Sequence, residues 1–406
     1  MKNLLQQKML KYDAPQRAKA AGVYPYFRVI ESDQDTVVTM GGKRVLMFGS
    51  NSYLGLTNHP KLKEAAKKAV DKYGSGCAGS RFLNGTLDLH IELENALAEF
   101  VGKDEAIVFS TGMQVNLGVL SSLLGRKDFI VSDDRNHASI VDGTRLSFAT
   151  TRKYKHNDMA SLEALLQRLE REREPESIAL IVMDGVFSME GDIAKLPEIV
   201  ELAKKYSANV MVDDAHGLGV LGDHGRGTSN HFGLNGEVDL IMGTFSKSLA
   251  TIGGFIAASY EVINFLKHNA RSLIFSASIA PANAAAVLAA IELIKNEPER
   301  IERLWDNTRY TKRLLDEIGF ETGLSETPII PIYVRDLNKT FMLTRMLQDE
   351  GVFVNPVITP AVAPEDTLIR FSLMATHTIE QIDEAIEKLA KVARHLDVPM
   401  PMRQMA

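Results

Sequence analysis

Short apolar segments alternate with longer amphipathic segments between residues 60 and 247 of this chain. The apolar segments have the length of β-strands, and the amphipathic ones repeat with helical periodicity. Such alternation is typical of a mostly parallel sheet with helices on both faces, in which ligands bind at the carboxyl ends of the strands. We therefore predict an α/β protein whose chemistry lies just after its strands. The expected strands are 106–110, 129–132, 178–183, 208–213 and 238–242, and the expected helices are roughly 60–73, 88–101, 113–124, 160–173 and 195–206.

The pattern changes on either side of this region. Beyond an alanine-rich helix near 281–296, strand signals at 327–334, 352–355 and 368–372 lie among helical segments, which predicts a smaller α+β domain. At the amino end we expect one amphipathic helix over residues 1 to 20, broken near Pro15, and this helix must dock on another surface. A hairpin is expected over 37–48. The predicted division is 1–48 for the N-terminal helix and hairpin, 49–288 for a large α/β domain, and 289–406 for a small C-terminal α+β domain.

Composition and charge narrow the classes of function. Of the 406 residues, 45% are hydrophobic and 24% are charged, which is ordinary for a globular protein. The net charge of -6, without a basic stripe, argues against a nucleic-acid partner. The single cysteine, Cys77, allows neither an internal disulfide nor a cysteine metal site, and we predict no metal. A signal peptide is not evident, so we expect a cytoplasmic protein, with peripheral contact at the inner membrane left open.

Lys247 follows the expected strand at 238–242 and lies in a loop of small residues. This setting suits a phosphate and a carbonyl group. An amine held among apolar neighbours has its charged form disfavoured, so it can attack an aldehyde near neutral pH and form a Schiff base. Taken alone, Ser-Lys-Ser is more often a surface sequence, so the other strand ends must decide. The small residues around Lys247 are Gly243, Thr244, Ser246 and Ser248.

Polar groups follow the other expected strands. Ser110–Met113 opens a helix, whose free amides can hold a phosphate. Asp133–His137 ends in an imidazole that can lie on an aromatic cofactor, and Asp184–Ser188 offers a hydroxyl. Asp213 and His216 are more specific, because a carboxylate facing a pyridine nitrogen keeps the ring protonated and makes it an electron sink. Each of these segments, read alone, is also compatible with a helix cap or a turn.

Three of these motifs together carry a resemblance to a known family. Asp213-Asp-Ala-His216, Thr244-Phe-Ser-Lys247 and the pair Gly253-Gly254 resemble the α-oxoamine synthases, which are pyridoxal-phosphate enzymes of the aspartate-aminotransferase fold, or fold type I. The resemblance covers about residues 20–395. It implies a mostly parallel, seven-stranded sheet between helices with a smaller C-terminal domain, pyridoxal 5'-phosphate as cofactor, and a homodimer with active sites at its interface. These enzymes condense an amino acid with an acyl-CoA and release carbon dioxide.

The resemblance also implies roles for single residues. Lys247 would bind the cofactor covalently, and Asp213 would face its pyridine nitrogen. The residues implied beside the ring are His137, which would stack on it, and His216 and Ser188, which would lie near its phenolic oxygen. Those implied at the phosphate or beside it are Gly112, Met113, Thr244 and Ser246, with Ser276 and Ala277 reaching it from the other subunit. Those implied at the substrates are Arg370, which would pair with the amino-acid carboxylate, Asn51, Tyr73 and His137.

Several substrates and reactions are weighed. The segments 73–86, 184–192 and 356–378 look most like the bacterial members that join L-serine to a long-chain acyl-CoA, giving 3-oxosphinganine. Members that condense glycine with acetyl-CoA are the nearest alternative. An aminotransferase or lyase on the same fold is an alternative of another class, and an inactive scaffold is a third. Small apolar residues between prolines in the loop Val357–Ala363 are the expected path for an acyl chain.

Overall fold

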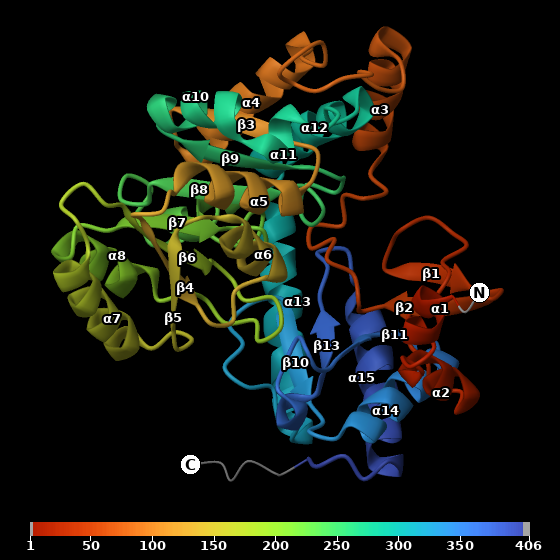
Figure 1. Ribbon diagram of the computed structural model, residues 1–406. Coiled ribbons are helices and arrows are strands. Elements are labelled where there is room, and N and C mark those ends of the chain that lie inside the picture. The colour runs from red at the N-terminus through yellow and green to blue at the C-terminus, as the bar shows by residue number, and fades with distance from the viewer. Residues whose placement is uncertain (1–2, 401–406) are drawn as a thin grey trace.

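A seven-stranded sheet forms the centre of the larger part of the molecule (Figure 1). The structure is a computed structural model that describes residues 3–400. The strand order is β3-β9-β8-β7-β6-β4-β5, and β9 runs antiparallel to both of its neighbours while the remaining pairs are parallel. The predicted mostly parallel sheet is therefore confirmed. Its strands are β3 (Glu105–Phe109), β4 (Phe129–Asp133), β5 (Thr150–Tyr154), β6 (Ala179–Asp184), β7 (Asn209–Asp213), β8 (Leu240–Thr244) and β9 (Gly254–Ala258).

Helices cover both faces of this sheet because its central strands are apolar on both sides. Every residue of β6 and β8 is buried. Leu180 and Val182 of β6 pack in a core with α5, α6, α10 and α11, whereas Ile181 and Met183 face the main core, to which α4, α7, α8 and α12 contribute. The helices of this part are α3 (Pro60–Tyr73), α4 (Asp88–Val101), α5 (Gly112–Leu123), α6 (Ala138–Leu146), α7 (Met159–Glu172), α8 (Leu196–Lys205), α9 (Thr228–His231), α10 (Tyr260–Asn269), α11 (Arg271–Ile274), α12 (Pro281–Asn296) and a 3₁₀ turn at Asp223–Gly225.

The sequence pattern missed two strands of the sheet and misplaced a third. The missed strand β5 reads Thr-Thr-Arg-Lys-Tyr and lies at one edge, where few apolar residues are needed. The other, β9, is short and follows directly on the loop of Lys247. Strand β8 begins two residues later than predicted, because the carboxylate of Asp239 accepts hydrogen bonds from Val210 N and Asn209 Nδ2 before the strand starts. The shift puts Thr244 at the last position of β8.

The C-terminal part has its own antiparallel sheet in the order β10-β13-β12, with the long helix α13 running beside it (Figure 1). The strand predicted at 352–355 is split: β11 pairs with β2 of the N-terminal hairpin, and β12 pairs with β13. The predicted domain boundaries at 48 and 288 stay a prediction. The elements outside the large sheet are β1 (Val37–Met40), β2 (Lys43–Met47), α13 (Glu299–Ile318), β10 (Ile329–Tyr333), α14 (Leu337–Asp349), β11 (Val352–Phe353), β12 (Asn355–Val357), a 3₁₀ turn at Pro364–Asp366, β13 (Leu368–Ser372) and α15 (Ile379–His395).

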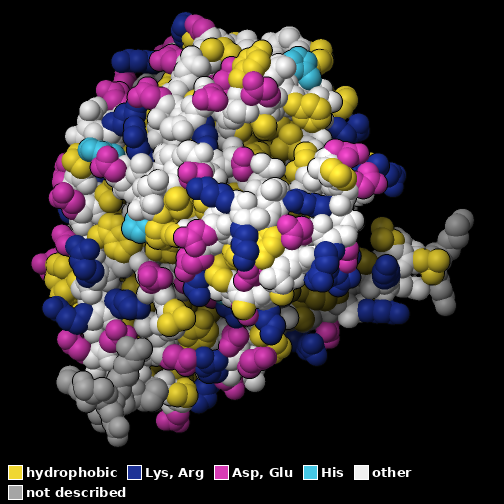
Figure 2. Space-filling model, turned by 90° about the vertical axis from the view of Figure 1, so that its left-hand side faces the viewer, with side chains coloured by type: hydrophobic (Ala, Val, Ile, Leu, Met, Phe, Trp, Pro, Cys, Tyr) yellow, Lys and Arg dark blue, Asp and Glu magenta, His cyan; other side chains and the backbone are white. Residues whose placement is uncertain are grey.

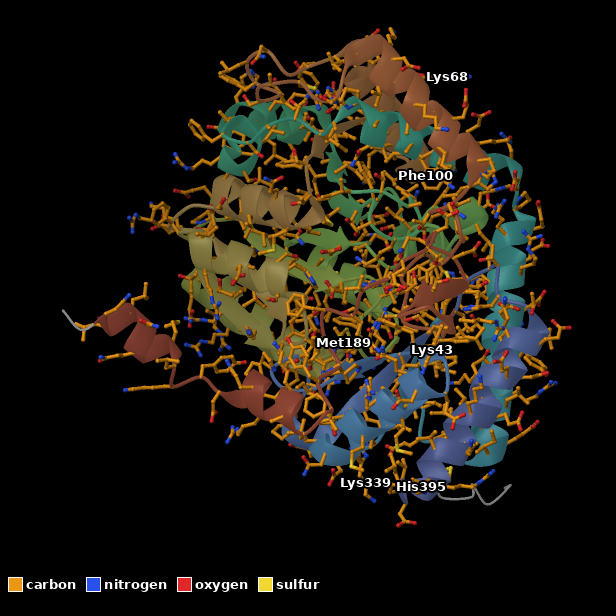
Figure 3. All side chains as sticks on the ribbon, turned by 90° about the vertical axis from the view of Figure 1, so that its right-hand side faces the viewer. Lys43, Lys68, Phe100, Met189, Lys339 and His395 are labelled. Atoms are coloured by element: carbon orange, nitrogen blue, oxygen red, sulfur yellow. The ribbon has the colours of Figure 1, made fainter. Side chains whose placement is uncertain are left out.

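An N-terminal arm, residues 3–20, stands away from the body of the molecule (Figures 2 and 3). The predicted helical segment is broken just before Pro15, so that it forms two short helices, α1 (Leu4–Met9) and α2 (Ala14–Ala20). Pro15 cannot continue a helix but suits the first turn of a new one. Neither helix has a buried residue, and Leu4 and Leu5 are 75% and 71% exposed. The expected docking surface therefore does not lie within the described part of this chain.

Within residues 3–400, no helix has both the length and the apolar character needed to cross a membrane.

Candidate active site

A cavity of about 330 Å³ opens at the carboxyl ends of β4, β6, β7 and β8. It brings together nine of the residues that the sequence singled out: Gly112, Met113, His137, Ser188, Asp213, His216, Thr244, Ser246 and Lys247. Each of them ends a strand, follows one or opens the next helix, as expected for a parallel sheet. The other lining residues are Thr111, Ser139, Asp184, Val186, Ala215, Met242, Ile252 and Gly253.

Lys247 lies just beyond β8 and lines this cavity. Burial lowers the pKa of its amine, and the nearby positive charge of Arg370 acts in the same direction. The negative charges of Asp213 and Asp184 oppose this shift but do not cancel it. Lys247 is therefore more easily deprotonated than an exposed lysine, as a nucleophile or a base requires.

The carboxylate of Asp213 is held in a fixed orientation at the end of β7. Its Oδ2 accepts a hydrogen bond of 2.7 Å from Nδ2 of Asn116, and its Oδ1 accepts one from the backbone N–H of Ala215. Asn116 is fully buried in α5, and the same Nδ2 also donates to Ser139 Oγ. Asn116 could not be singled out from the sequence, because its contact with Asp213 joins residues that are far apart in the chain.

A hydrogen-bonded chain links His216 to Arg370 through the hydroxyl of Tyr53. Arg370 Nη2 donates to that hydroxyl at 3.1 Å, and the hydroxyl lies 2.7 Å from Nδ1 of His216. Burial raises the pKa of Tyr53, while burial together with Lys247 and Arg370 lowers that of His216 well below its usual range. The hydroxyl thus keeps its proton and donates it to Nδ1 of a neutral imidazole. We infer that the proton of His216 is on Nε2.

Arg370 in β13 is only 5% exposed, and its guanidinium makes four hydrogen bonds to uncharged oxygens. Besides Tyr53, Nε donates to the backbone carbonyl of Ser188 at 2.6 Å, and Nη1 donates to Asn51 Oδ1 at 2.7 Å and to Ser372 Oγ at 2.8 Å. A buried cation whose protein partners are all neutral still favours a negatively charged ligand. Arg370 and Asn51, both implied at the substrate, thus lie side by side, and their role in binding it stays a prediction.

His137 caps the start of α6 and reaches the cavity. Its backbone N–H donates to Asp184 Oδ2 at 3.1 Å, and its Nδ1 accepts from the backbone N–H of Ser139. Burial lowers the pKa of His137, so the imidazole is neutral, with its proton on Nε2 because Nδ1 is an acceptor. Burial and the charge of Asp213 raise the pKa of Asp184 well above its usual range.

Gly112 allows two backbone segments to meet at the start of α5. A Cβ atom on Gly112 would lie 2.8 Å from Thr244 Oγ1, and one on Gly254 would lie 2.8 Å from the Cα of Gly112. Thr111 caps the helix with its hydroxyl, and the first residues of α5, Gly112 and Met113, line the cavity together with Thr244 and Ser246. Free helix amides and two hydroxyls form a site suited to a phosphate.

The remaining predicted residues lie outside the lining of this cavity. Ser276 Oγ accepts a hydrogen bond from Gln114 Nε2, and the carbonyl of Ala277 accepts one from Ser110 Oγ. Tyr73, at the end of α3, donates to Asp88 at 2.6 Å. Their roles at the cofactor or substrate stay predictions, since those of Ser276 and Ala277 involve a second subunit.

Comparison with known proteins assigns the family. Residues 43–389 match the family described as aminotransferase class I and II. The chain belongs to this family. Serine palmitoyltransferase of Bacteroides thetaiotaomicron is 64% identical over 395 residues, which are 97% of this chain and 99% of that protein. An 8-amino-7-oxononanoate synthase of Alkaliphilus metalliredigens is 43% identical over 98% of this chain and 100% of that protein.

A solved structure of serine palmitoyltransferase from S. paucimobilis, with a bound PLP–myriocin aldimine, superimposes with a TM-score of 0.93. The two chains are 36% identical, and the superposition covers 98% of this chain and 100% of the solved chain. The predicted fold type I, the α-oxoamine synthase assignment within the aminotransferase class I and II family and the cofactor pyridoxal 5'-phosphate are thereby confirmed.

The cavity of this family member fits that cofactor. Lys247 offers an amine for an aldehyde, Asp213 offers a carboxylate for a ring nitrogen, and the start of α5 offers amides for a phosphate. Within residues 3–400, Oδ1 of Asp184 is buried and has no hydrogen-bond partner, so the cavity holds a polar group that a ligand can satisfy. Tyr53 and Asn116 were not predicted from the sequence. Tyr53 bonds to His216 and Arg370, and Asn116 bonds to Asp213, so both support predicted residues.

Proposed function

We propose that this protein is a serine palmitoyltransferase, which condenses L-serine with palmitoyl-CoA to give 3-oxosphinganine, CoA and carbon dioxide, the first step of sphingolipid biosynthesis. The observation that carries the proposal is the 64% identity to a relative of that name over almost the full length of both chains. The cavity supplies the groups that the reaction requires, as the following paragraphs argue.

Pyridoxal phosphate, when bound, withdraws electrons from the α-carbon of an attached amino acid. The amine of Lys247, with its lowered pKa, takes the proton from that carbon. Asp213, which Asn116 holds in place, would keep the ring nitrogen of the bound cofactor protonated, and Nε2 of His216, whose Nδ1 is bonded to Tyr53, would donate to the phenolic oxygen. Together these groups would make the α-carbon nucleophilic.

Arg370 binds the carboxylate of the amino acid in the proposed reaction. The hydrogen-bond partners of its guanidinium are all uncharged, so its positive charge can be neutralised by the substrate carboxylate. Asn51 and Tyr53 hold the guanidinium in place. The neutral His137 can donate from Nε2 to the thioester oxygen of the acyl-CoA and stabilise the negative charge that develops there. Attack of the α-carbon on the thioester carbonyl forms the new carbon–carbon bond and releases CoA. The bond between the α-carbon and the carboxylate then breaks and releases carbon dioxide, and the α-carbon takes up a proton to give the amino ketone.

The mouth of the cavity has an apolar rim that suits an acyl chain. Met113 and Ile252 both line the cavity and are 40% and 55% exposed. Each methylene that leaves water contributes roughly 0.8 kcal/mol, so a long chain gains more here than an acetyl group. The loop Val357–Ala363, in which Val357 is buried and Val362 half-buried, stays the predicted path for the far end of the chain.

The proposal is tested by product analysis with four pairs of substrates: L-serine or glycine, each with palmitoyl-CoA or acetyl-CoA. We expect L-serine with palmitoyl-CoA to give by far the fastest release of CoA, accompanied by a long-chain amino ketone. Robust turnover of glycine with acetyl-CoA, and little of the serine pair, would assign the protein to the alternative synthase. Transfer of the amino group without any acyl-CoA would indicate an aminotransferase.

The active unit is proposed to be a homodimer in which Ser276 and Ala277 of one chain reach the phosphate bound by the other. Both residues are accessible and lie outside the cavity of their own chain. Mixing a Lys247→Ala chain with a Ser276→Asp chain should restore part of the activity, because one of the two composite sites is then intact. A protein that sediments as a monomer and is fully active at the same concentration would contradict this arrangement.

The N-terminal arm is proposed to touch the cytoplasmic face of the inner membrane. Leu4, Leu5 and Leu10 are exposed apolar residues. Among the described residues of the arm, the charged ones are Lys8, Lys11, Arg17, Lys19 and a single acid, Asp13. A basic and apolar segment suits an anionic lipid surface. The full chain should float with vesicles containing phosphatidylglycerol, and Leu4→Asp with Leu5→Asp should abolish flotation; equal flotation of the variant would contradict the contact.

A further inference from the structure

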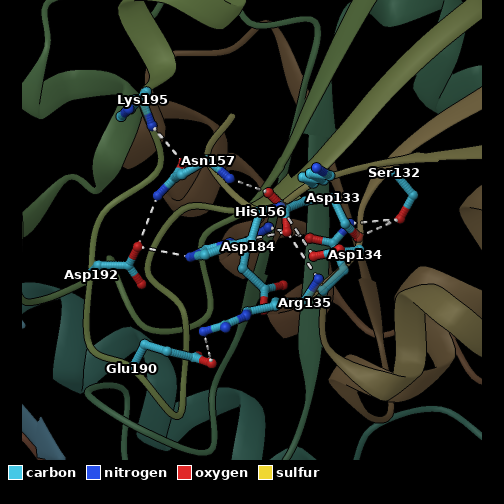
Figure 4. A network of polar contacts seen from close by, with 12 residues as sticks. Ser132, Asp133, Asp134, Arg135, His156, Asn157, Asp184, Glu190, Asp192 and Lys195 are labelled. Atoms are coloured by element: carbon cyan, nitrogen blue, oxygen red, sulfur yellow. Dashed lines mark hydrogen bonds and ion pairs between the residues drawn. The ribbon is translucent and has the colours of Figure 1, made fainter. Parts of the chain in front are cut away.

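His156 lies outside the cavity. It is placed between the loop that follows β4 and the loop 184–192, both of which contribute residues to the lining of the cavity (Figure 4). It follows β5, and its ring has two carboxylate neighbours: Nδ1 is 3.1 Å from Asp133 Oδ1, and Nε2 is 2.9 Å from Asp192 Oδ2. An ionised carboxylate only accepts hydrogen bonds, and a neutral imidazole has only one N–H to donate. Both contacts are satisfied together when His156 is an imidazolium.

The surroundings of His156 favour this charged form. Burial alone disfavours the imidazolium, but the hydrogen bonds and charges of Asp133 and Asp192 outweigh it and raise the pKa of His156 to about 10. We call His156 and its two partners, Asp133 and Asp192, the clamp. Its contribution to stability is complete below pH ~6.5, the usual pKa of histidine in an unfolded chain, and is lost as the pH rises through about 10. The other charged groups around the ring are Asp134, Arg135, Asp184 and Glu190.

One side of the clamp fixes the loop that leads to His137. Asp133 ends β4, and its Oδ1 also accepts the backbone N–H of Arg135, two residues before His137. Its Oδ2 accepts the backbone N–H of Asn157. The conformation at the end of β4 therefore depends on the segment that carries His156.

The other side fixes the loop 184–192, which carries Ser188. Asp192 closes this loop, because its carbonyl accepts the backbone N–H of Phe187, and the ring of Phe187 packs edge-on against His156 with centroids 4.3 Å apart. The next residue, Ser188, gives its carbonyl to Nε of Arg370. A short path thus runs from the imidazolium through Phe187 and Ser188 to the guanidinium.

We propose that His156 is a positioning residue, which holds the loop 184–192 so that the carbonyl of Ser188 keeps Arg370 aimed at the carboxylate of the amino-acid substrate. The inference rests on the proposed function, in which Arg370 binds that carboxylate. Without the imidazolium, Asp133 and Asp192 face each other with no cation between them, and their repulsion displaces the loop. The loss falls mainly on substrate binding, because Lys247, Asp213 and the start of α5, which fit the cofactor's aldehyde, ring nitrogen and phosphate, follow other strands.

The test compares the parent with His156→Gln, which keeps polarity but cannot carry the charge. His395→Gln, at an exposed histidine at the end of α15 (Figure 3), is the matched control. Cofactor content is measured by absorbance, and the affinity for L-serine by titration of that absorbance. We expect His156→Gln to retain its cofactor and to lose about tenfold in serine affinity and KM, with kcat changed less than about threefold. Unchanged serine affinity in a fully loaded variant would overturn the proposal, whatever happens to its melting temperature.

A second variant covers the case in which His156→Gln does not fold. Asp192→Asn keeps the shape of the side chain and removes one of the two charges, so it should weaken serine binding in the same direction but less; unchanged affinity again overturns the proposal. Histidine labelled with ¹⁵N should show one imidazolium at about pH 8.5 that is absent from His156→Gln. If the parent itself binds neither L-serine nor glycine, the proposed function fails instead, before any variant is compared.

Discussion

The cofactor end of the site, which is the cavity, and its substrate end around Arg370, which lies outside the lining of the cavity, are built in different ways. At the cofactor end, Lys247 and Asp213 follow neighbouring strands of one sheet, so the geometry of the sheet alone brings them together. At the substrate end, Arg370 is held by Asn51, Tyr53 and Ser188, which come from two other parts of the chain. Cofactor binding and amino-acid binding therefore depend largely on separate structural elements. Substitutions should therefore be able to damage one and spare the other.

The largest effect is expected at the cofactor end. Lys247→Ala should lower turnover by at least about 10³-fold, because it removes both the covalent attachment and the base. The purified parent should be yellow, and the variant should lose the parent's absorbance band even when the cofactor is added. Turnover of this variant at the parent's rate would remove Lys247 from the centre of the account.

Arg370→Ala should have the opposite profile. The cofactor band should stay, while L-serine binding weakens by about 2–5 kcal/mol, the usual cost of removing one side of a buried charged pair. Arg370→Lys is the matched control: it keeps the charge but loses the planar fork, so its loss should be smaller. Unchanged serine affinity in the alanine variant would assign the carboxylate to another group, such as Asn51.

Tyr53→Phe tests the junction between the two ends. The substitution keeps the ring and removes the hydroxyl that joins His216 to Arg370, at a cost of about 1–3 kcal/mol. We expect a weaker affinity for L-serine together with a shift of the cofactor's absorbance maximum, since both partners lose a hydrogen bond. A change in only one of the two measurements would show that the ends are more independent than the structure indicates.

The smallest effect is expected in the loop Val357–Ala363. Val362 is half-buried in the loop after β12, so Val362→Asp should raise KM for palmitoyl-CoA severalfold and leave the affinity for L-serine unchanged. Val362→Ala provides the control for loss of size without gain of charge. An equal effect on palmitoyl-CoA and acetyl-CoA would place the acyl path elsewhere, for example along Met113 and Ile252.

The same comparison explains what could be predicted from the sequence. Cofactor-end residues follow apolar strands, and a parallel sheet gathers strand ends at one edge whatever else the chain does. Tyr53 and Asn116 were missed because their partners lie 163 and 97 positions away, and only tertiary structure sets those distances. Arg370 was found through the family resemblance, since an arginine in a strand carries no local signal of its own.

The N-terminal arm and β5 show the limits of periodicity. An amphipathic repeat predicts a helix with an apolar face but does not say which surface covers that face, and within residues 3–400 none does. In β5, Thr, Arg and Lys are tolerated because the strand lies at the edge of the sheet. His156 follows β5, and it was not singled out because this polar edge strand was not predicted.

The most direct test of the central claim follows the carbon atoms of the amino acid. L-Serine labelled with ¹³C at the carboxyl carbon or at carbon 3 is incubated with palmitoyl-CoA, and the lipid product is examined by mass spectrometry. The account predicts that the carbon-3 label is retained in a long-chain amino ketone and that the carboxyl label leaves entirely as carbon dioxide. A product that keeps the carboxyl label, or consumption of serine that does not depend on acyl-CoA, would contradict it.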